Sequence, residues 1–167
     1  NLLANVDDSR LRYLSQLNKE LLGRYQVGQS DDFDGLTVQV YSFSIKSGYP
    51  PLNPEHGGGF VFDCRYLPNP GQLDLYKNLT GLDKPVIDYL LSLDEVNVFC
   101  DNAFSLVKSA IDKYLSRNFK HLSVGFGCTG GQHRSVFCAE NLVKQLKSTF
   151  GDSGLRILVK HIELEKR

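Results

Sequence analysis

The chain has 167 residues, which is enough for one domain with a sizeable core and too few for two. Its 19 Lys and Arg equal its 19 Asp and Glu, so the domain as a whole is not expected to present a basic surface to a polyanion. No apolar run approaches the ~18 residues of a membrane span, which argues against a membrane protein. The four cysteines are scattered and form no C-x2-C pair, which argues against a zinc site and a disulfide scaffold.

The first predicted element is an amphipathic helix over residues 8–22, where leucines recur at intervals of three and four residues and Gly23 follows. The chain opens on Asn1 without a signal peptide and contains no Met, so we expect a fragment of a longer, cytoplasmic protein. We assign residues 1–30 to this helix and a linker, and residues 31–167 to the main domain.

Strands and helices then alternate along the chain. Apolar and polar residues alternate over 36–43, which is typical of a strand, and a Pro- and Gly-rich loop follows. A short buried strand ends at Asp63 and Arg65, two charged residues at a place where open α/β sheets commonly build sites; a solvated strand end is the alternative. Asp83 can cap the next helix, with Pro85 in its first turn.

The remaining elements favour one fold class. A longer helix carries its apolar residues from Val96 to Tyr114, and a strand over 121–127, a glycine-rich loop, a helix over 134–150 and a strand over 155–162 come after it. Strand, loop, helix and strand form a βαβ unit, whose strands are parallel and joined by a right-handed crossover. We therefore predict a single α/β domain with a mostly parallel sheet flanked by helices.

The loop "CTGGQHRS" at residues 128–135 can hold an anion. Its glycines let backbone amides turn inward, and a helix that begins near His133 or Arg134 adds its N–H groups and the positive end of its dipole. Arg134 can form a fork to phosphate oxygens, while Thr129 and Ser135 can add hydroxyl contacts. A merely tight turn would explain the glycines but not the polar residues beside them.

Two familiar patterns overlap this loop. G-x-G-x-x-G from Gly125 is weak as a dinucleotide fingerprint, because Gly125 and Gly127 fall within the predicted strand and no acidic residue follows at the usual offset of ~20 residues. C-x5-R from Cys128 to Arg134 is typical of cysteine-dependent phosphatases, with Cys128 as nucleophile and Arg134 as phosphate clamp. Cysteine-dependent phosphatases usually have His at the position of Gly127, and this difference argues against the activity. Phosphatase activity is therefore the alternative hypothesis, and anion binding is the leading one.

Five strings in the same order resemble the C-terminal domain of the bacterial RapZ family. They are SFSIKSG at 42–48, FDCRYLPNP at 62–70, LTGLDKPV at 79–86, GCTGGQHRSV at 127–136 and the terminal LEKR. The resemblance implies a domain that follows an N-terminal P-loop nucleotide-binding domain, and no G-x4-G-K-[ST] occurs here. ATP or GTP would belong to such a missing domain, itself nucleotide-hydrolysing or kinase-like, and we expect no cofactor in this one.

The resemblance further implies a regulatory role rather than catalysis. In the family this domain is associated with binding an amino-sugar phosphate and with recognising small RNA as an adaptor for a ribonuclease, and homo-oligomers would form through the full-length protein. Carried over residue by residue, the ligand site comprises Cys128, Thr129, Gly130, Gly131, Gln132, His133, Arg134 and Ser135 of the loop, with Asp63, Arg65, Asn69, Thr80 and Gly81 of the strand-end set. The sequence departs from the family pattern at Ser44 and Gly71.

RNA binding would depend on a local cluster, because the net charge is zero. The best candidates are Lys160, Lys166 and Arg167 near the end of the chain. Glu163 and Glu165 dilute this cluster, and an ordinary surface of mixed charge is the alternative.

Overall fold

The computed structural model of the chain describes residues 33–50, 58–151 and 154–166. The helix predicted over residues 8–22 lies outside them, as does Arg167. From Asp34 onward the residues belong to one compact unit that ends at Arg167.

Four parallel strands form one sheet in the order β2-β3-β1-β4. Their bounds are Leu36–Ser44 for β1, Gly59–Asp63 for β2, His121–Cys128 for β3 and Leu155–His161 for β4. The predicted α/β class, parallel sheet and βαβ unit are therefore confirmed. The register aligns Ser44 of β1 with Cys128 of β3, and Asp63 of β2 with Gly127, so the carboxyl ends of three strands meet at one edge.

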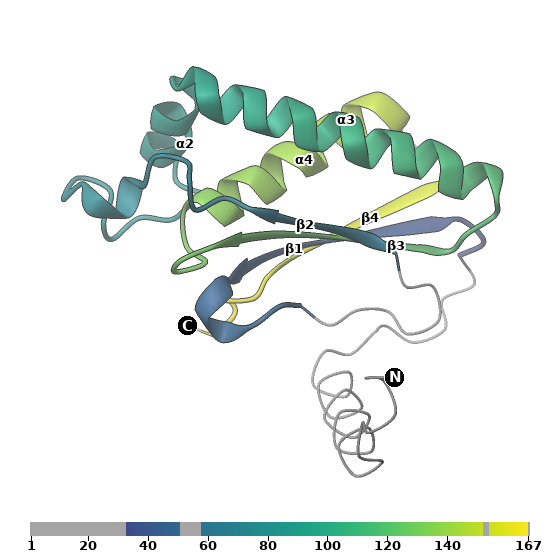
Figure 1. Cartoon of the computed structure of the whole chain (residues 1–167), viewed down its shortest axis with the longest axis horizontal. Helices are drawn as coiled ribbons and strands as arrows, with labels where there is room; N and C mark the ends of the chain where they lie inside the picture. The colour runs from purple at the N-terminus through teal and green to yellow at the C-terminus, as the bar shows by residue number, and fades with distance from the viewer. Residues whose placement is uncertain (1–32, 51–57, 152–153, 167) are drawn as a thin grey trace, which may run out of the picture. The chain divides into compact units, whose positions relative to one another are not determined.

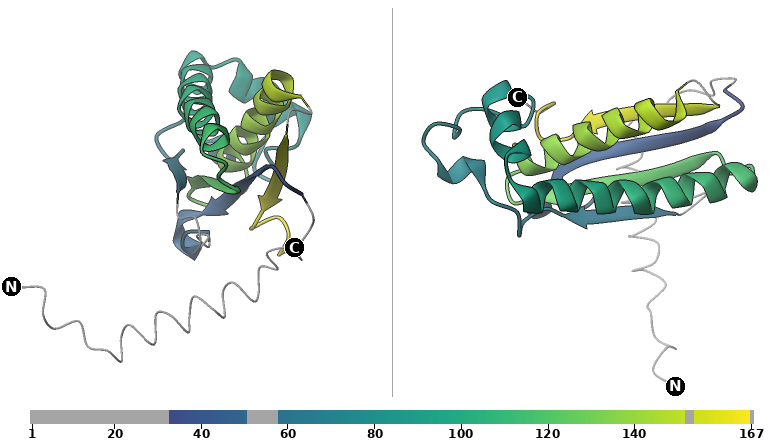
Figure 2. Two further views of the ribbon diagram at one scale, coloured as in Figure 1. Left: turned by 90° about the vertical axis from the view of Figure 1, so that its right-hand side faces the viewer. Right: turned by 90° about the horizontal axis from the view of Figure 1, so that it is seen from above.

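The three α-helices within the described residues lie on one face of this sheet (Figures 1 and 2). They are α2 Lys84–Leu91, α3 Asp94–Ser116 and α4 Arg134–Phe150. The connections from β2 to β3 and from β3 to β4 run across the sheet in the same direction, so right-handed crossovers place their helices on the same side. The connection from β1 to β2 runs the opposite way and starts on the other face, with the short 3-10 helix η1 Ile45–Ser47 (Figure 1).

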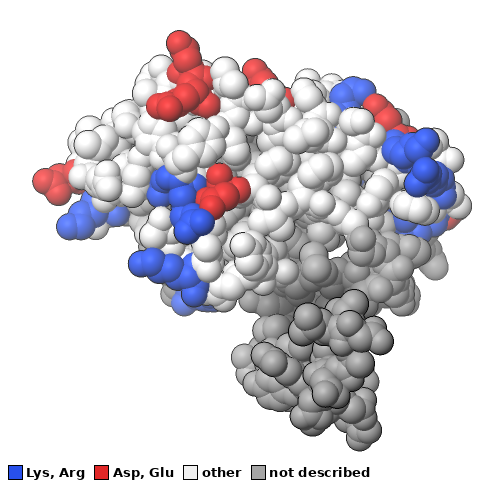
Figure 3. Space-filling model, viewed as in Figure 1, with Lys and Arg blue, Asp and Glu red and all other residues white. Residues whose placement is uncertain are grey.

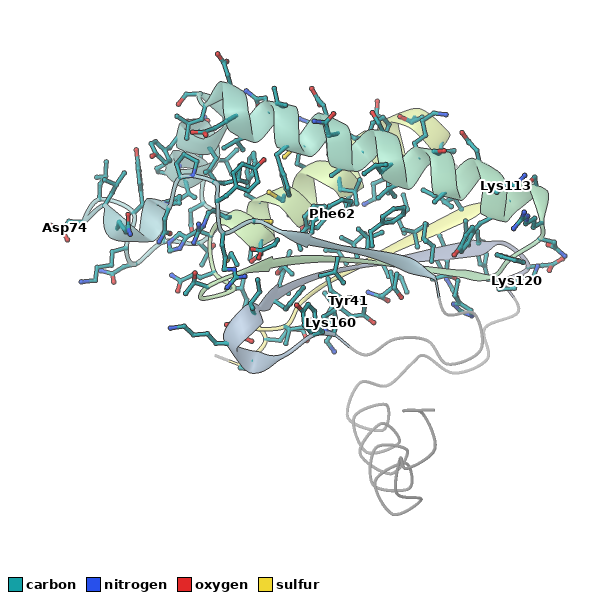
Figure 4. All side chains as sticks on the ribbon, in the orientation of Figure 1. Tyr41, Phe62, Asp74, Lys113, Lys120 and Lys160 are labelled. Carbon is teal, nitrogen blue, oxygen red and sulfur yellow. The ribbon has the colours of Figure 1, made fainter. Side chains whose placement is uncertain are left out.

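The core fills the space between the sheet and the helices. Alternate residues of the central strands, such as Val38 and Val40 of β1 and Val124 of β3, are fully buried there, as period-two alternation requires. Figure 4 shows Phe62 on this side, whereas Tyr41 and Lys160 project from the opposite face. None of the helices within the described residues is long and apolar enough to cross a membrane.

The glycines of the dinucleotide-like pattern have a packing role on the opposite face. Phe43 is 1% exposed, and its ring lies across β3. A Cβ atom at Gly127 would lie 2.8 Å from Phe43 Cζ and 2.8 Å from Ile45 Cγ1, and one at Gly125 would lie 3.2 Å from Phe43 Cε1. Both glycines lie within β3, as predicted, and leave room for the aromatic ring.

Candidate functional site

The loop after β3 lies where the direction of the chain changes between neighbouring strands. After β1 the chain turns to one face of the sheet, and after β3 it turns to the other to enter α4. Open α/β sheets bind ligands outside the carboxyl ends of strands at such a switch point. A hydrogen bond links the end of β1 to the loop after β3, because the Ser44 hydroxyl donates to the Thr129 carbonyl at 2.7 Å.

The two loop glycines have different surroundings. Gly131 is buried with φ of +65°, a left-handed conformation that favours glycine. A Cβ atom there would collide with Glu163 Cγ and lie 2.7 Å from the Ser44 nitrogen. Gly130 is exposed, and nothing lies within 4 Å of the position of its Cβ. The loop is thus fixed at Gly131 and open to solvent at Gly130.

Helix α4 begins next to this opening with unbonded amides. His133 occupies the N-cap position, but its side chain makes no capping hydrogen bond. Among the described residues, no group accepts a hydrogen bond from the backbone N–H of Gly130, Gly131, Arg134 or Ser135. Donors at a helix N-terminus, aligned with the positive end of its dipole, favour a negatively charged ligand.

Arg134 is a buried cation that forms no direct ion pair among the described residues. Only 4% of it is exposed, and its Nη1 donates to the carbonyls of Arg65 at 2.7 Å and Leu67 at 2.9 Å. Its Nε is buried without a partner, and no carboxylate of the described residues pairs with it. Arg134 thereby joins the start of α4 to the turn that follows β2. It forms no ion pair with a carboxylate of the described residues, although, beside the hydrogen bonds from Arg65, its charge contributes to the lowered pKa of Asp63.

Asp63 forms a salt bridge with Arg65. The Arg65 guanidinium donates to both carboxylate oxygens of Asp63, with Nη2 2.6 Å from Oδ2, and about half of each side chain is exposed. This hydrogen bonding holds the pKa of Asp63 below its ordinary value. The two residues lie at the predicted strand end and form a pair with each other.

Gln132 and His133 hold the segment between β2 and α2, which projects beyond the carboxyl edge of the sheet (Figure 1). Gln132 Nε2 donates to the Leu79 carbonyl at 2.6 Å, and His133 Nε2 lies 2.9 Å from the Tyr76 carbonyl, which can only accept. Gly81 N–H donates to the Gln132 carbonyl at 2.9 Å. A Cβ atom at Gly81 would collide with the His133 carbonyl, so only glycine permits this approach to α4.

Asn69 and Thr80 make local turns beside the loop. Asn69 Oδ1 accepts from Gly71 N–H at 3.1 Å and caps the short 3-10 helix η2 Pro70–Gln72. Thr80 donates from its N–H and its hydroxyl to the Asp83 carboxylate, at 2.7 and 2.8 Å, and these bonds lower the pKa of Asp83. Asp83 does precede α2, as predicted, but the capping prediction was wrong in its chemistry, because the carboxylate bonds Thr80 instead of the helix amides.

The Cys128 thiol is enclosed beneath the loop. It is 3% exposed, and its Sγ lies 3.2 Å from the Oγ of Ser135, which is fully buried. Cys128 is as buried as Arg134, so its burial does not separate phosphate binding from the phosphatase hypothesis, which the Cys128→Ser substitution tests. Among the described residues, no group of three or more His, Cys, Asp or Glu could hold a metal ion.

The structure brings three further residues to the loop. Ser44 and Gly71 stood out only as departures from the family pattern, and Glu163 only as an acidic neighbour of lysines. Ser44 bonds the loop, and a Cβ at Gly71 would lie 3.3 Å from His133 Cε1, so glycine leaves room for that imidazole. The position of Ser44 at a strand end was the one signal in the sequence that could have singled it out.

The RNA-binding candidates within the described residues are engaged with carboxylates. Lys160 Nζ lies 3.3 Å from Glu165, and Lys166 Nζ lies 2.9 Å from Glu163. On the described surface that Figure 3 displays, basic and acidic side chains are interspersed in small groups.

The fold and the loop define an α/β domain with a polar site at the switch point of a parallel sheet. A family model described as the RapZ C-terminal domain matches residues 36–165, and the chain therefore belongs to this family. The resemblance noted in the sequence is confirmed.

Curated relatives cover most of the chain. It is 35% identical over 148 residues to a nucleotide-binding protein of Thermotoga neapolitana, covering 89% of the chain and 48% of the relative. A nucleotide-binding protein of Clostridium acetobutylicum is 34% identical over 167 residues, 99% of the chain and 53% of the relative. One of Dinoroseobacter shibae is 41% identical over 132 residues, 79% of the chain and 41% of the relative. The chain thus spans about half the length of these relatives.

Proposed function

We propose that this domain binds a phosphate-bearing small molecule, a phosphosugar, at the loop after β3. The observation that carries the proposal is Arg134, a cation that is 4% exposed and has no carboxylate partner among the described residues. A buried charge without a counterion costs several kcal/mol, which neutral carbonyls offset only in part. A bound anion would supply the missing charge.

The surroundings of Arg134 suit a phosphoryl group. The amides of Gly130, Gly131 and Ser135 supply further donors at the N-terminus of α4. The open space around Gly130 gives a ligand a way in without displacing a side chain. Thr129 and the exposed Asp63–Arg65 pair line the same edge of the sheet and can contact the remainder of a sugar phosphate.

The biological role that we propose is regulatory. As the family resemblance implies, the domain would sense an amino-sugar phosphate within a longer, cytoplasmic adaptor that acts on small RNA together with a ribonuclease. The relatives carry the name of nucleotide-binding proteins. We assign nucleotide binding, of ATP or GTP, to a part of such proteins other than this loop, since neither glycine of the dinucleotide-like pattern in β3 faces an open space.

Isothermal titration calorimetry with inorganic phosphate and with hexose phosphates tests the proposal. We expect binding that is lost when sulfate competes, and a gain in melting temperature with ligand concentration. Arg134→Ala should weaken binding by about 1.5–3 kcal/mol, the scale of a charge-assisted contact. Arg117→Ala is the matched control, because Arg117 is exposed at the end of α3. Absence of binding at millimolar phosphate would refute the proposal.

A further inference from the structure

Backbone hydrogen bonds hold the turn after β4 against the ends of β1 and β4. Ile162 N–H donates to the Ser42 carbonyl of β1 at 3.0 Å, and the N–H groups of Leu164 and Glu165 both donate to the His161 carbonyl at 3.1 Å. Ile162 is 6% exposed. These bonds set the course of residues 162–166 along the carboxyl edge of the sheet.

A second attachment passes through the imidazole of His161. His161 Nε2 lies 2.9 Å from Glu140 Oε1 of α4, and a carboxylate can only accept, so Nε2 donates. In the neutral ring Nδ1 then accepts from the hydroxyl of Ser42, 2.8 Å away and fully buried. One side chain thus ties β4 to β1, whose Ser44 bonds the loop, and to α4, which the loop enters.

Glu163 lies between this anchored turn and the loop. Its Cγ occupies the space beside Gly131, where a Cβ atom would collide with it, and only 18% of its side chain is exposed. On the other side of the same Cβ position lie the Ser44 nitrogen at 2.7 Å and the Phe43 carbonyl carbon at 2.9 Å. Gly131 is therefore enclosed between the end of β1 and the aliphatic stem of Glu163.

The carboxylate of Glu163 has a separate partner. Lys166 Nζ lies 2.9 Å from Glu163 Oε1, three residues further along the same turn. The pair keeps a negative charge beside the loop locally balanced, and it restricts the rotamers of the Glu163 stem. Lys166 is thereby engaged within the turn.

We propose that Glu163 is a positioning residue for the loop. Its stem holds Gly131 in the left-handed conformation and so fixes the direction of the neighbouring N–H groups. The effect on ligand affinity rests on the proposed phosphate site, whereas the effect on the loop itself does not. The contribution comes from the packing of the stem, and the charge of the carboxylate is secondary.

Hydrogen–deuterium exchange of the loop, followed by mass spectrometry, tests this role. Glu163→Ala removes the stem, so we expect the amides of residues 129–133 to exchange at least tenfold faster, with β3 and α4 unchanged. Glu163→Gln keeps the stem and should exchange like the unmodified protein. Glu165→Ala is the matched control, since Glu165 is exposed and pairs with Lys160. Inorganic phosphate should bind the Ala variant at least fivefold more weakly and the Gln variant normally.

The exchange and binding results separate the two proposals. If the unmodified protein binds no phosphate, the proposed function fails, while the exchange of the loop still decides the role of Glu163. Unchanged loop exchange in Glu163→Ala would overturn the positioning role. Equally fast loop exchange in the Ala and Gln variants would also overturn it, because the effect would then come from the charge. Faster exchange throughout the domain would overturn it too, because Glu163 would then stabilise the whole domain.

Discussion

Arg134 connects two segments that the sequence places far apart. Its Nη1 bonds to the turn at residues 65–67, while its backbone starts α4. The sequence indicated an arginine at a helix start beside glycines, and from that a phosphate contact was predicted. The sequence could not indicate that Arg134 is buried. Its burial depends on a turn about 70 residues earlier in the chain, whose carbonyls contact the guanidinium.

Replacing Arg134 should therefore affect stability as well as binding. In Arg134→Ala the carbonyls of Arg65 and Leu67 lose a donor, and each acceptor that is left unsatisfied and buried costs about 1–3 kcal/mol. The removal of a buried charge that has no direct ion-pair partner offsets part of this loss. Urea denaturation without phosphate should show a lower midpoint than that of Arg117→Ala, and a higher midpoint would show that the charge outweighs its hydrogen bonds.

Cys128→Ser separates phosphate binding from phosphatase catalysis. The thiol is buried against Ser135, so we expect phosphate affinity within about twofold of the original, because the change replaces sulfur by a smaller hydroxyl. An aryl phosphate assay should show no hydrolysis that depends on Cys128. Robust turnover by the unmodified protein that vanishes in this variant would instead favour the cysteine phosphatase.

Asp83 gives the turn before α2 a dependence on pH. Hydrogen bonds from Thr80 lower the pKa of its carboxyl in the folded state, so its stabilising contribution is present above the unfolded pKa of ~3.9 and is lost as the pH falls through the folded pKa. Asp83→Asn should destabilise the domain at pH 7, and the difference between the two proteins should shrink progressively as the pH falls below the unfolded pKa of ~3.9. Denaturant midpoints of both proteins across this range measure the difference, and a constant difference would contradict the assignment.

At the scale of elements, the sequence predicted most strands and helices but not their arrangement. Alternation in β1 and the amphipathic pattern of α4 are local, so their bounds came within one or two residues of the structure. Which face of the sheet receives the helices depends on the strand order β2-β3-β1-β4, which no local pattern encodes. The sequence also could not show which hydrogen bonds Asp83 makes, because Thr80 and the helix amides compete for its carboxylate.

The packing of Phe43 on β3 makes a prediction about that strand. Gly127→Ala places a Cβ 2.8 Å from the buried ring, and overpacking of this kind costs about 1–3 kcal/mol. Gly130→Ala, where nothing lies within 4 Å, should leave stability nearly unchanged. Thermal unfolding of the two variants makes the comparison, and equal melting temperatures would remove the packing role of Gly127.

At the scale of the whole molecule, electrostatics limits what this domain can hold. The full chain has equal numbers of acidic and basic residues, and the described surface in Figure 3 carries side chains of both signs in small groups. This charge distribution suits a small anion at the loop better than a long polyanion. An RNA needs many cations at spaced positions, and Lys160 and Lys166 each have a carboxylate partner.

We therefore expect weak RNA binding by this chain at physiological salt. A filter-binding titration with structured RNA at 50 and 200 mM salt should give little retention at the higher concentration. Lys166→Ala should change retention less than twofold, because Lys166 is paired with Glu163. Tight binding that falls steeply with salt and with this substitution would restore the C-terminal cluster as an RNA surface.

The pairing of the last strand with the first has a consequence for synthesis of the chain. His161 of β4 meets Ser42 of β1 across 119 residues, so β1 leaves the ribosome long before its second neighbour exists. Until β4 arrives, one edge of β1 presents unpaired backbone groups, a state open to aggregation. Glu163 follows β4, so the loop acquires its last neighbour only then. A ligand that recognises the finished loop would accordingly select complete, correctly folded chains.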